Sequence, residues 1–592
     1  MRALVMFIGL VAVALATQVG SLPGAPPNWL KPRAGESPPP HSIPKRPGHY
    51  DSTDWRRVID ETWGPGLPVD ERLGIFDAFW ETIDSSFGCF NNLTVNWDSL
   101  RAVYRTEVEA ETMSRGRFAA IMDHLAMALQ EGHTDIGDIA VKYSQMTPGV
   151  PLWVVGSWQE VGHFGAGLTP LPDSSLLVYR VVDAHPLGLE RGDVVLGYDR
   201  RRWVDILHEL QEAQLPIRRR YCLGSCSSAM TYSLLSAAGE NWHLFDTIDI
   251  LKYSSGDTVH LLTVPLARRT MHLFATDQMD IPGVPMPATD STPSVTHGVV
   301  SGTRIGYIYC WRWWTGTVAT EFYDAVNTLV SDTTLKGIVI DFRYNEGGSI
   351  GPSNSGLELL YRDSTATICF TQRSDPANHF SMRVTNAALW YIIPGNGIGY
   401  DKPIAVLVGP GAVSAGDQVA LRMTFHPRVR TFGLSTNTAF SCPRSLSVHD
   451  GWYASYSPWE SCLASDTTYF LTHREFPVDV QVWHTRDAVA EGRDAVVEAA
   501  MAWIDSTAGV EEGTPSAERR ATKVATIIRG VLSLPEATGF QPQASSSLLD
   551  AAGRRVMNLR PGANDVNRLA PGVYVVKLKS GTTSQTRKLV IR

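Results

Sequence analysis

The stretch KGIVIDFRYNEGGSIG, residues 336–351, combines an apolar strand with a glycine-rich loop. The apolar run that ends at Asp341 is typical of a strand buried on both faces, as in a parallel sheet. Gly347 and Gly348 allow the following loop to turn tightly and to bring its backbone close to a ligand. Their N–H groups can hold an oxyanion. Taken alone, the segment favours a simple turn, so its chemical role depends on a second feature.

The second feature is a strand-to-helix junction in PIAVLVGPGAVSAGDQVA, residues 403–420. Ser414 follows the apolar strand and stands where a helix begins. The N-terminus of a helix favours developing negative charge, and the N–H of Ala415 is a further candidate oxyanion donor. The alternative, which this segment alone favours, is that Ser414 only caps the helix.

The surrounding chain alternates strands and helices, which predicts an α/β layer with parallel pairing. Upstream, apolar residues at three- and four-residue steps predict helices within residues 68–130, and short β-rich runs follow over 150–265. The tail from about residue 545 is all strand and turn, which indicates a small β-sandwich. The strands expected in the α/β layer are residues 304–311, 336–342, 403–409 and 429–433, and its helices are 320–330, the segment from 414, and 492–504.

The N-terminus, MRALVMFIGLVAVALATQ, has the features of a secretory signal peptide. A short apolar run leads to Ala14-Leu15-Ala16, which predicts cleavage after Ala16. A membrane anchor is the weaker alternative, because the run falls short of the roughly 20 residues that a span needs. Residues 17–55 are rich in proline and form a predicted linker. The sequence thus predicts an exported protein without a stable membrane span.

Composition excludes several classes of function. The 592-residue chain has a net charge of −8, which does not favour nucleic-acid binding. It has no glycine-rich phosphate loop, no HExxH and no paired CxxC, so no metal and no cofactor are predicted.

Cysteines permit disulfides in an exported chain. The closely spaced Cys222 and Cys226 are one candidate pair, and Cys442 and Cys462, which flank one loop, are another. The count of seven leaves at least one thiol over. The alternative is that all of them are small buried side chains.

Taken together and in this order, the two segments resemble the S41 peptidase family of tail-specific and tricorn-type serine peptidases. The family's D-x-R-x-N-x-G-G loop is matched by DFRYNEGG, residues 341–348, and its S-A-x-[DE] by SAGD, residues 414–417. The resemblance covers roughly residues 68–505. It implies a multidomain α/β protein with a crotonase/ClpP-like peptidase core.

Further segments extend the resemblance. GLERGDVVLGYDRRRWVDIL, residues 188–207, resembles the PDZ-like module that precedes the core, and residues 75–104 resemble the helical domain of the tricorn-like branch. LAPGVYVVKL and the terminal RKLVIR resemble a type IX secretion sorting domain, which implies a secreted or cell-surface protein; an adhesive or carbohydrate-binding β-sandwich is the alternative. The domains expected are a signal peptide (1–16), a linker (17–55), the helical domain (56–148), the PDZ-like module (149–266), the S41 core (298–506), a linker (507–540) and the sorting β-sandwich (541–592).

The resemblance also implies a base for the serine. One branch of the family uses a lysine, but this chain has none between Lys402 and Lys523, and Ala439 stands near the expected place. The tricorn-type branch uses a histidine, which is matched by His133 in LQEGHTDI. An imidazole suits this role because its pKa lies near neutral pH. His124 and His449 are fallback candidates.

Two more positions follow from the tricorn-type pattern. Its downstream glutamate is matched best by Glu475 in HREFPVDVQV. The serine that this branch places before its histidine is replaced here by Gly132, so Thr134 is the candidate to orient the imidazole instead.

The sequence therefore predicts a secreted serine endopeptidase that acts on peptides or proteins. His133 takes the proton of Ser414, Ala415 and either Gly347 or Gly348 hold the oxyanion, and Glu475 assists the relay. The alternative is an S41-like peptide-binding protein without turnover. An acyl-CoA enzyme of the related crotonase fold is disfavoured, because it would have no use for the PDZ-like and sorting segments.

Overall fold

The computed structural model describes most of the chain between residues 65 and 507. The gaps in that part are 143–163, 214–222, 243–244, 264, 267–277, 287–292, 315 and 386–391; residues 55–57 and 60 and most of 526–591 are also described. The chain divides into two compact units, Met1–Ala508 and Gly509–Arg592. The predicted signal peptide and almost all of the proline-rich linker lie outside the described residues, as does most of the linker 507–540.

The first unit is built around a six-stranded sheet. Its strands are parallel to their neighbours except for the antiparallel edge strand β8, which confirms the expected parallel α/β layer. The strand order is β20 (Val480–Gln481), β16 (Val429–Gly433), β15 (Ile404–Val408), β10 (Gly337–Asp341), β9 (Ile305–Cys310) and β8 (Val295–Val299).

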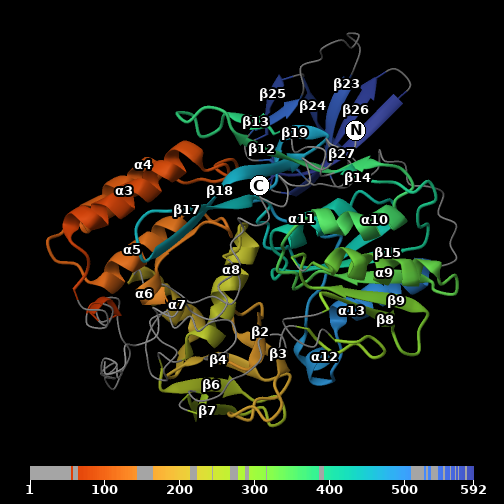
Figure 1. Ribbon diagram of the computed structural model, residues 1–592. Helices are drawn as coiled ribbons and strands as arrows, with labels where there is room; N and C mark the ends of the chain where they lie inside the picture. The colour runs from red at the N-terminus through yellow and green to blue at the C-terminus, as the bar shows by residue number, and fades with distance from the viewer. Residues whose placement is uncertain are drawn as a thin grey trace. The chain divides into compact units, whose positions relative to one another are not determined.

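Helices cover both faces of this sheet (Figure 1). Ile338 and Ile340 of β10 pack with α9 (Val318–Ser331), α10 (Asn354–Leu360) and α11 (Ala415–Met423). Val339 points to the opposite face and packs with α13 (Ala495–Thr507). Alternate residues of the strand thus serve two apolar layers, which explains why its sequence reads as one continuous apolar run.

A second sheet joins the N-terminal helices to the core. Its longest strand, β18 (Trp452–Leu463), pairs antiparallel with strands from four other parts of the chain, and β13 (Met382–Val384) pairs with β12. The partners of β18 are β1 (Asp135–Asp138), β12 (Ile368–Arg373), β17 (Cys442–Leu446) and β19 (Asp466–Phe470). Because β1 begins two residues after His133, this sheet carries the N-terminal histidine to the core.

The predicted N-terminal helices are confirmed as α3 (Val69–Ser86), α4 (Trp97–Val108) and α5 (Arg115–Met127), and a short α6 (Ile139–Lys142) follows β1. Ser114 caps α5, since its side chain accepts a hydrogen bond from the N–H of Arg117 at 2.9 Å. The stacked rings of Trp80 and Trp97 join α3 to α4.

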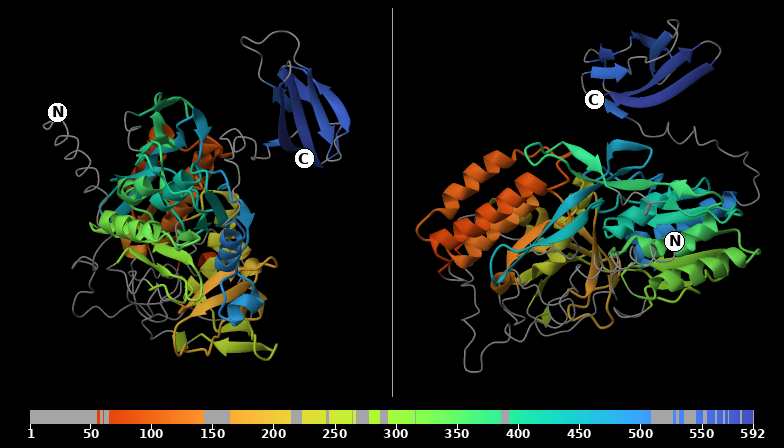
Figure 2. Two further views of the ribbon diagram at one scale, coloured as in Figure 1. Left: turned by 90° about the vertical axis from the view of Figure 1, so that its right-hand side faces the viewer. Right: turned by 45° about the horizontal axis from the view of Figure 1, so that its top comes forward.

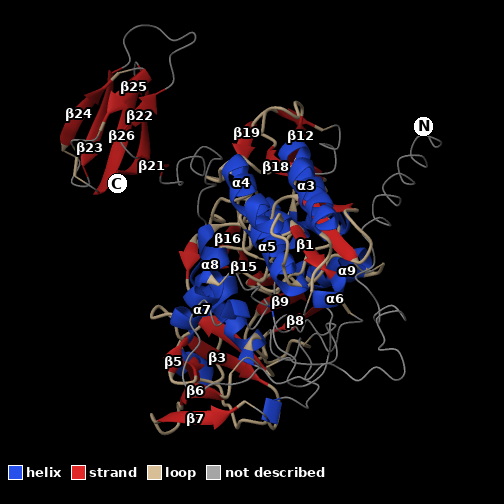
Figure 3. Ribbon diagram, turned by 90° about the vertical axis from the view of Figure 1, so that its left-hand side faces the viewer, coloured by secondary structure: helices blue, strands red, loops and turns tan. Residues whose placement is uncertain are grey.

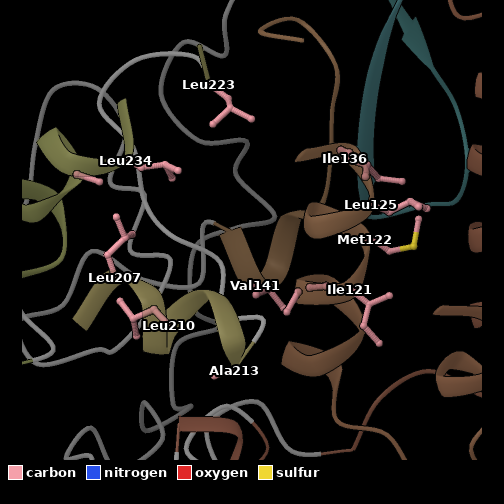
Figure 4. Close-up of a cluster of buried hydrophobic side chains, with 14 of the residues drawn as sticks. Ile121, Met122, Leu125, Ile136, Val141, Leu207, Leu210, Ala213, Leu223 and Leu234 are labelled. Atoms are coloured by element: carbon pink, nitrogen blue, oxygen red, sulfur yellow. The ribbon is translucent and has the colours of Figure 1, made fainter. Parts of the chain in front are cut away.

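A third, antiparallel sheet contains β2 (Ala166–Pro170), β3 (Leu176–Val181), β4 (Val194–Tyr198), β5 (Arg201–Arg202), β6 (Thr247–Leu251) and β7 (Thr258–Leu262). Two helices, α7 (Trp203–Glu212) and α8 (Ser227–Ser236), accompany these strands (Figure 3). They share one hydrophobic cluster with the N-terminal helices: Figure 4 shows Leu207 and Leu234 on one side of it and Ile121 and Val141 on the other.

The described residues of the second unit are mainly strands, as the sequence predicts, and they are blue in Figure 2. Its buried core includes Leu548, Leu559, Val566, Tyr574 and Val576. One sheet has the order β21 (Thr526–Ile528), β27 (Thr583–Ile591), β26 (Gly572–Ser580), β23 (Ser545–Asp550) and β24 (Arg555–Leu559), and the other pairs β22 (Val531–Leu534) with β25 (Gly562–Asp565).

The cysteine pairing expected at residue 462 is corrected. Cys462 on β18 lies directly opposite Cys369 on β12, whereas Cys442 lies opposite Trp459. Cys222, the expected partner of Cys226, lies outside the described residues. Among the helices that the structure describes, none is both long enough and apolar enough to cross a membrane.

Candidate active site

Ser414 occupies a strained turn between β15 and α11. Its backbone has φ 59° and ψ −121°, and the N–H of Gly416 donates to the carbonyl of Val413 at 2.9 Å. This is the geometry of a type II′ turn with the serine at the position that normally demands glycine. The side chain does not cap α11, and within the described residues the hydroxyl makes no hydrogen bond. The turn therefore presents the hydroxyl instead of using it as a helix cap.

The loop 341–348 packs directly against this turn. The N–H of Val413 donates to the carbonyl of Asn345 at 2.9 Å, and the Asn345 amide in turn donates to the carbonyl of Cys310 at 2.7 Å. At Gly347, with φ 86°, an added Cβ would stand 2.7 Å from the Cβ of Ser414. Only glycine allows this approach, so the two sequence motifs meet as expected.

The first half of the same loop is held by a buried ion-pair network. Asp341 accepts hydrogen bonds from Arg343 at 2.7 Å and from the Tyr307 hydroxyl at 2.7 Å. Arg343 also pairs with Asp494 at 2.8 Å, and the Asp494 carboxylate accepts from the N–H of Val496 at the start of α13. Burial raises the pKa of Asp494, but the charges of Arg343 and His484 and the hydrogen bonds from Arg343 and Val497 together outweigh this and lower it. The network ties the glycine loop to α13.

The backbone donors near Ser414 differ in availability. The N–H of Gly347 already donates to Asn345 Oδ1 at 3.0 Å. Trp313 is hydrogen-bonded to the residues on both sides of Gly348. Its N–H donates to the carbonyl of Gly347, and its carbonyl accepts from the N–H of Ser349. In the described part of the chain, the N–H groups of Gly348 and Ala415 donate no hydrogen bond. Of the two glycines, Gly348 therefore has the donor that remains available.

His133 is held through one ring nitrogen. Its Nδ1 lies 2.8 Å from Ser441 Oγ and 3.1 Å from Glu131 Oε1, and the Ser441 hydroxyl lies 2.6 Å from the same carboxylate oxygen. An ionised carboxylate can only accept, so this arrangement places the proton of a neutral imidazole on Nδ1. Nε2 then carries the lone pair, and among the described residues it makes no hydrogen bond.

Glu131 is a buried carboxylate that the sequence reading missed. It accepts hydrogen bonds from the hydroxyls of Thr134 and Ser457, each at 2.8 Å. Burial alone would raise its pKa, but the charge of His133 and hydrogen bonds from His133, Ser441 and Ser457 lower it to about 2. Glu131 is therefore ionised at neutral pH beside the imidazole. Its position two residues before His133 is the sequence signal that could have identified it.

Residues 436–441 connect the histidine to the serine. On the serine side, the N–H of Asn437 donates to the carbonyl of Ala412 and that of Thr438 donates to Asp417, each at 2.9 Å. On the histidine side, Ser441 of the same segment contacts the imidazole. One short segment is thus hydrogen-bonded on both sides of the site.

Asp417, the acidic residue of the SAGD motif, is fully buried between these groups. Burial raises its pKa to about 7, although the hydrogen bond from the N–H of Thr438, the nearby Thr436 side chain and the charge of His133 oppose this rise. One of its carboxylate oxygens has no hydrogen-bond partner. A carboxyl whose pKa is raised to near neutral therefore lies between the Ser414 turn and the segment 436–441.

Glu475 lies at the N-terminus of α8. Its carboxylate accepts from the backbone N–H of Ser228 at 3.1 Å and from the hydroxyl of the same residue at 2.5 Å. Cys226 Sγ is a further neighbour at 3.3 Å. Among the described residues, no hydrogen bond or ion pair joins Glu475 to His133. The structure therefore does not bring Glu475 to the imidazole.

The departures from the tricorn-type pattern have physical reasons. An added Cβ at Gly132 would stand 2.9 Å from Asn437 Oδ1 and 3.1 Å from the carbonyl of Leu223, which leaves no room for a serine. Thr134 donates to Glu131, whereas the hydroxyl on the imidazole comes from Ser441. The buried Ala439 packs against Gly132, where the other branch of the family would have its lysine.

His124 and His449, the other histidines considered as the base, have different neighbours from His133. His124 is in the last turn of α5, and His449 is partly exposed, with its Nε2 3.4 Å from Glu71. In the described part of the chain, no group of three or more His, Cys, Asp or Glu residues could hold a metal ion.

Comparison with known proteins identifies two parts of the chain. Residues 304–470 match the model of peptidase family S41. The chain carries an S41 peptidase domain. Residues 537–592 match the model of the secretion system C-terminal sorting domain. The predicted class, a serine-type peptidase of family S41 with a sorting domain, is confirmed.

The chain is also similar to several solved structures. The mature CPAF protein in complex with lactacystin has 12% identity and a TM-score of 0.52, over 73% of this chain and 98% of that one. A putative peptidase from Parabacteroides merdae ATCC 43184 has 16% identity and a TM-score of 0.43, over 73% and 96%. The tricorn protease has 13% identity and a TM-score of 0.35, over 74% and 37%. No curated protein matches the chain in sequence. The family match over residues 304–470 and the likeness to mature CPAF confirm the S41-like α/β fold, whereas the PDZ-like nature of the third sheet stays a prediction.

Proposed function

We propose that this protein is a secreted serine endopeptidase with Ser414 as its nucleophile and His133 as its base. One observation carries the proposal: the hydroxyl of the strained Ser414 caps nothing, and the same segment, 436–441, is hydrogen-bonded to residues on either side of Ser414 and to His133. Strained backbone persists only where the surrounding structure enforces it, and it clusters at functional sites.

The reaction follows from the placement of donors and acceptors. His133 Nε2 takes the proton of the Ser414 hydroxyl as its oxygen attacks the peptide carbonyl. The N–H groups of Gly348 and Ala415 hold the oxyanion that forms, and the positive end of α11 adds to this stabilisation. His133 then gives the proton to the leaving amine, and water releases the acyl group by the same route. Apart from the peptide and this water, the groups that act in each step belong to this chain.

Glu131 completes the relay in this proposal. Its carboxylate fixes the Nδ1–H tautomer and stabilises the imidazolium that forms during attack, which is the role of the third residue in a Ser-His-acid site. The contacts of Glu131 with His133 and Ser441 support this assignment. Glu475, the acid expected from the sequence, is the alternative.

The remaining modules have roles that follow from the sequence. We assign the third sheet, β2 to β7, to a PDZ-like module that offers a sheet edge or groove to an extended peptide. The signal peptide directs the first export step, and the C-terminal β-sandwich is the partner of the type IX secretion machinery. The protein then acts at the cell surface or outside the cell.

A fluorophosphonate probe tests the nucleophile. The folded wild-type protein should be labelled on Ser414 and should hydrolyse a peptide substrate, and Ser414→Ala should abolish both. Ser435, which directly precedes the connecting segment 436–441, provides the control, because Ser435→Ala should keep the labelling. The second candidate function is that of a peptide-binding protein without turnover. It is motivated by the lack of a hydrogen bond or ion pair between Glu475 and His133, and it would be favoured if the folded wild-type protein were not labelled.

A further inference from the structure

Two cysteines face each other across the second sheet. Cys369 of β12 lies directly opposite Cys462 of β18 in an antiparallel pair. Directly opposite residues point to the same face, with Cα atoms about 4.5–5.5 Å apart, which is within the range that a disulfide requires. The two Sγ atoms lie 2.8 Å apart, closer than a van der Waals contact. The backbone thus already has the geometry of a cross-link.

The surroundings of this pair do not suit a nucleophilic thiol or a metal site. Both residues are buried, with exposed fractions of 3% for Cys369 and 0% for Cys462. Burial raises the pKa of Cys462, so its thiol is a poor nucleophile. Within the described residues the pair also lacks a third His, Cys, Asp or Glu that could complete a metal site.

We propose that Cys369 and Cys462 form a disulfide in the exported protein. Each thiol loses its hydrogen, a bond forms between the two sulfurs, and two electrons and two protons pass to a disulfide of the oxidising compartment. That acceptor, a thiol oxidoreductase or oxidised glutathione, is reduced to two thiols. Because the sulfurs are buried, the exchange takes place before β12 and β18 close over them. The inference rests on export and not on the proposed hydrolysis.

The cross-link acts on the strand that positions the base. The hydroxyl of Ser455 on β18 donates to the carbonyl of His133 at 2.6 Å, and that of Ser457 donates to Glu131. The two cysteines are 93 positions apart, and the loop that they close contains Ser414. A disulfide here removes freedom from the unfolded chain and holds β18 in register with β12.

Cys442, which the sequence suggested as the partner of Cys462, provides a matched control. It lies on β17 opposite Trp459, is less buried than Cys369, and makes no hydrogen bond or disulfide with another cysteine among the described residues. Its thiol is expected to remain free.

Peptide mapping of the full-length protein tests the proposal. The protein is purified after export, denatured without reductant in excess iodoacetamide, and digested with trypsin. Cys369, Cys442 and Cys462 then fall in three different peptides, residues 363–373, 431–444 and 445–474. We expect 363–373 joined to 445–474, lighter by two hydrogen atoms than the sum of the thiol peptides, with 431–444 alkylated. Reduction before digestion should separate the pair.

Alkylation of both Cys369 and Cys462, or a link from Cys462 to Cys442, overturns the proposal. The variants Cys369→Ser and Cys462→Ser should each leave the other cysteine alkylated and lower the Tm by several degrees. Wild-type protein refolded in reductant should show the same lower Tm. If a variant does not fold, the wild-type peptide map still decides. Ser414→Ala protein should give the wild-type map, so failure of the disulfide and failure of the hydrolytic mechanism are distinguishable.

Discussion

At the scale of single residues, the site depends on which carboxylate serves His133. Glu131 contacts the imidazole and is fully buried, whereas Glu475 contacts α8. We expect Glu131→Gln to lower kcat by about 10²- to 10⁴-fold, because an amide does not stabilise the imidazolium or enforce the Nδ1–H tautomer. Glu475→Gln is the matched control and should change kcat by no more than about threefold, since surface exchanges away from the chemistry have small effects.

Steady-state kinetics on both variants, together with circular dichroism to confirm folding, provides the measurement. A large loss of kcat in Glu475→Gln with near-normal activity in Glu131→Gln would reverse the assignment. If both variants lost their activity, the contact of Glu475 with Ser228 at the start of α8 would also support the site.

The residues that the sequence could identify are those in motifs read along the chain. Ser414, Ala415 and the paired glycines belong to two segments with fixed internal spacing, so their meeting could be expected. Glu131 differs because its role depends on Ser441 and Ser457, which reach it from distant strands. Nothing in the residues around Glu131 indicates that its side chain is buried. The choice of Gly348 over Gly347 likewise depends on a hydrogen bond from Gly347 to Asn345 that only the folded loop shows.

At the scale of elements, β18 organises the site but is absent from the sequence prediction. Its twelve residues include Pro458, which cannot donate to a strand partner and usually argues against a central strand. The structure accommodates the proline through a register shift in the pairing of β17 with β18, between Cys442 and Arg444. The strands of the parallel sheet could be predicted because each is a continuous apolar run, whereas β18 is defined by its non-local partners.

A buried carboxyl on β18 gives this strand a measurable pH dependence. Glu460 is fully buried; one oxygen accepts two hydrogen bonds from Thr472, and the other has no partner. Burial raises its pKa to about 7, with a smaller contribution from the charge of Glu131, although the hydrogen bonds from Thr472 oppose the rise. The folded state therefore keeps this proton to a higher pH than the unfolded state does. Between about pH 4.5 and pH 7 the unfolded state loses its proton first, so stability falls as pH rises.

Glu460→Gln removes this dependence. We expect the variant to gain stability relative to wild type as pH rises from 5 to 8, by up to about 3 kcal/mol, since each pKa unit corresponds to about 1.4 kcal/mol. Urea unfolding at pH 5, 6, 7 and 8 measures the difference. Glu111→Gln, at an exposed position, is the control and should show a pH-independent difference. A constant difference for Glu460→Gln as well would mean that Glu460 is ionised in the folded protein.

At the scale of the whole molecule, chemistry and export are assigned to separate units. The candidate site residues, from Glu131 to Glu475 along the chain, all lie within the unit Met1–Ala508. The sorting domain belongs to the unit Gly509–Arg592, whose buried cluster is drawn from its own strands. The sequence could predict this division, because composition and motifs both change between residues 507 and 540.

A chain ended after Ala508 should therefore keep its hydrolytic activity and lose its export. We expect kcat/KM of the purified truncated protein to stay within about twofold of the full-length value, since no residue of the relay or oxyanion site is removed. In a host with type IX secretion machinery, the truncated chain should accumulate in the periplasm, whereas the full-length chain should reach the medium or the cell surface. Fractionation and immunoblotting measure the distribution, and the full-length Ser414→Ala variant, exported but inactive, is the control. If the truncated chain were still exported, the C-terminal unit would not be the export signal; a folded but inactive truncated chain would instead show that this unit takes part in catalysis.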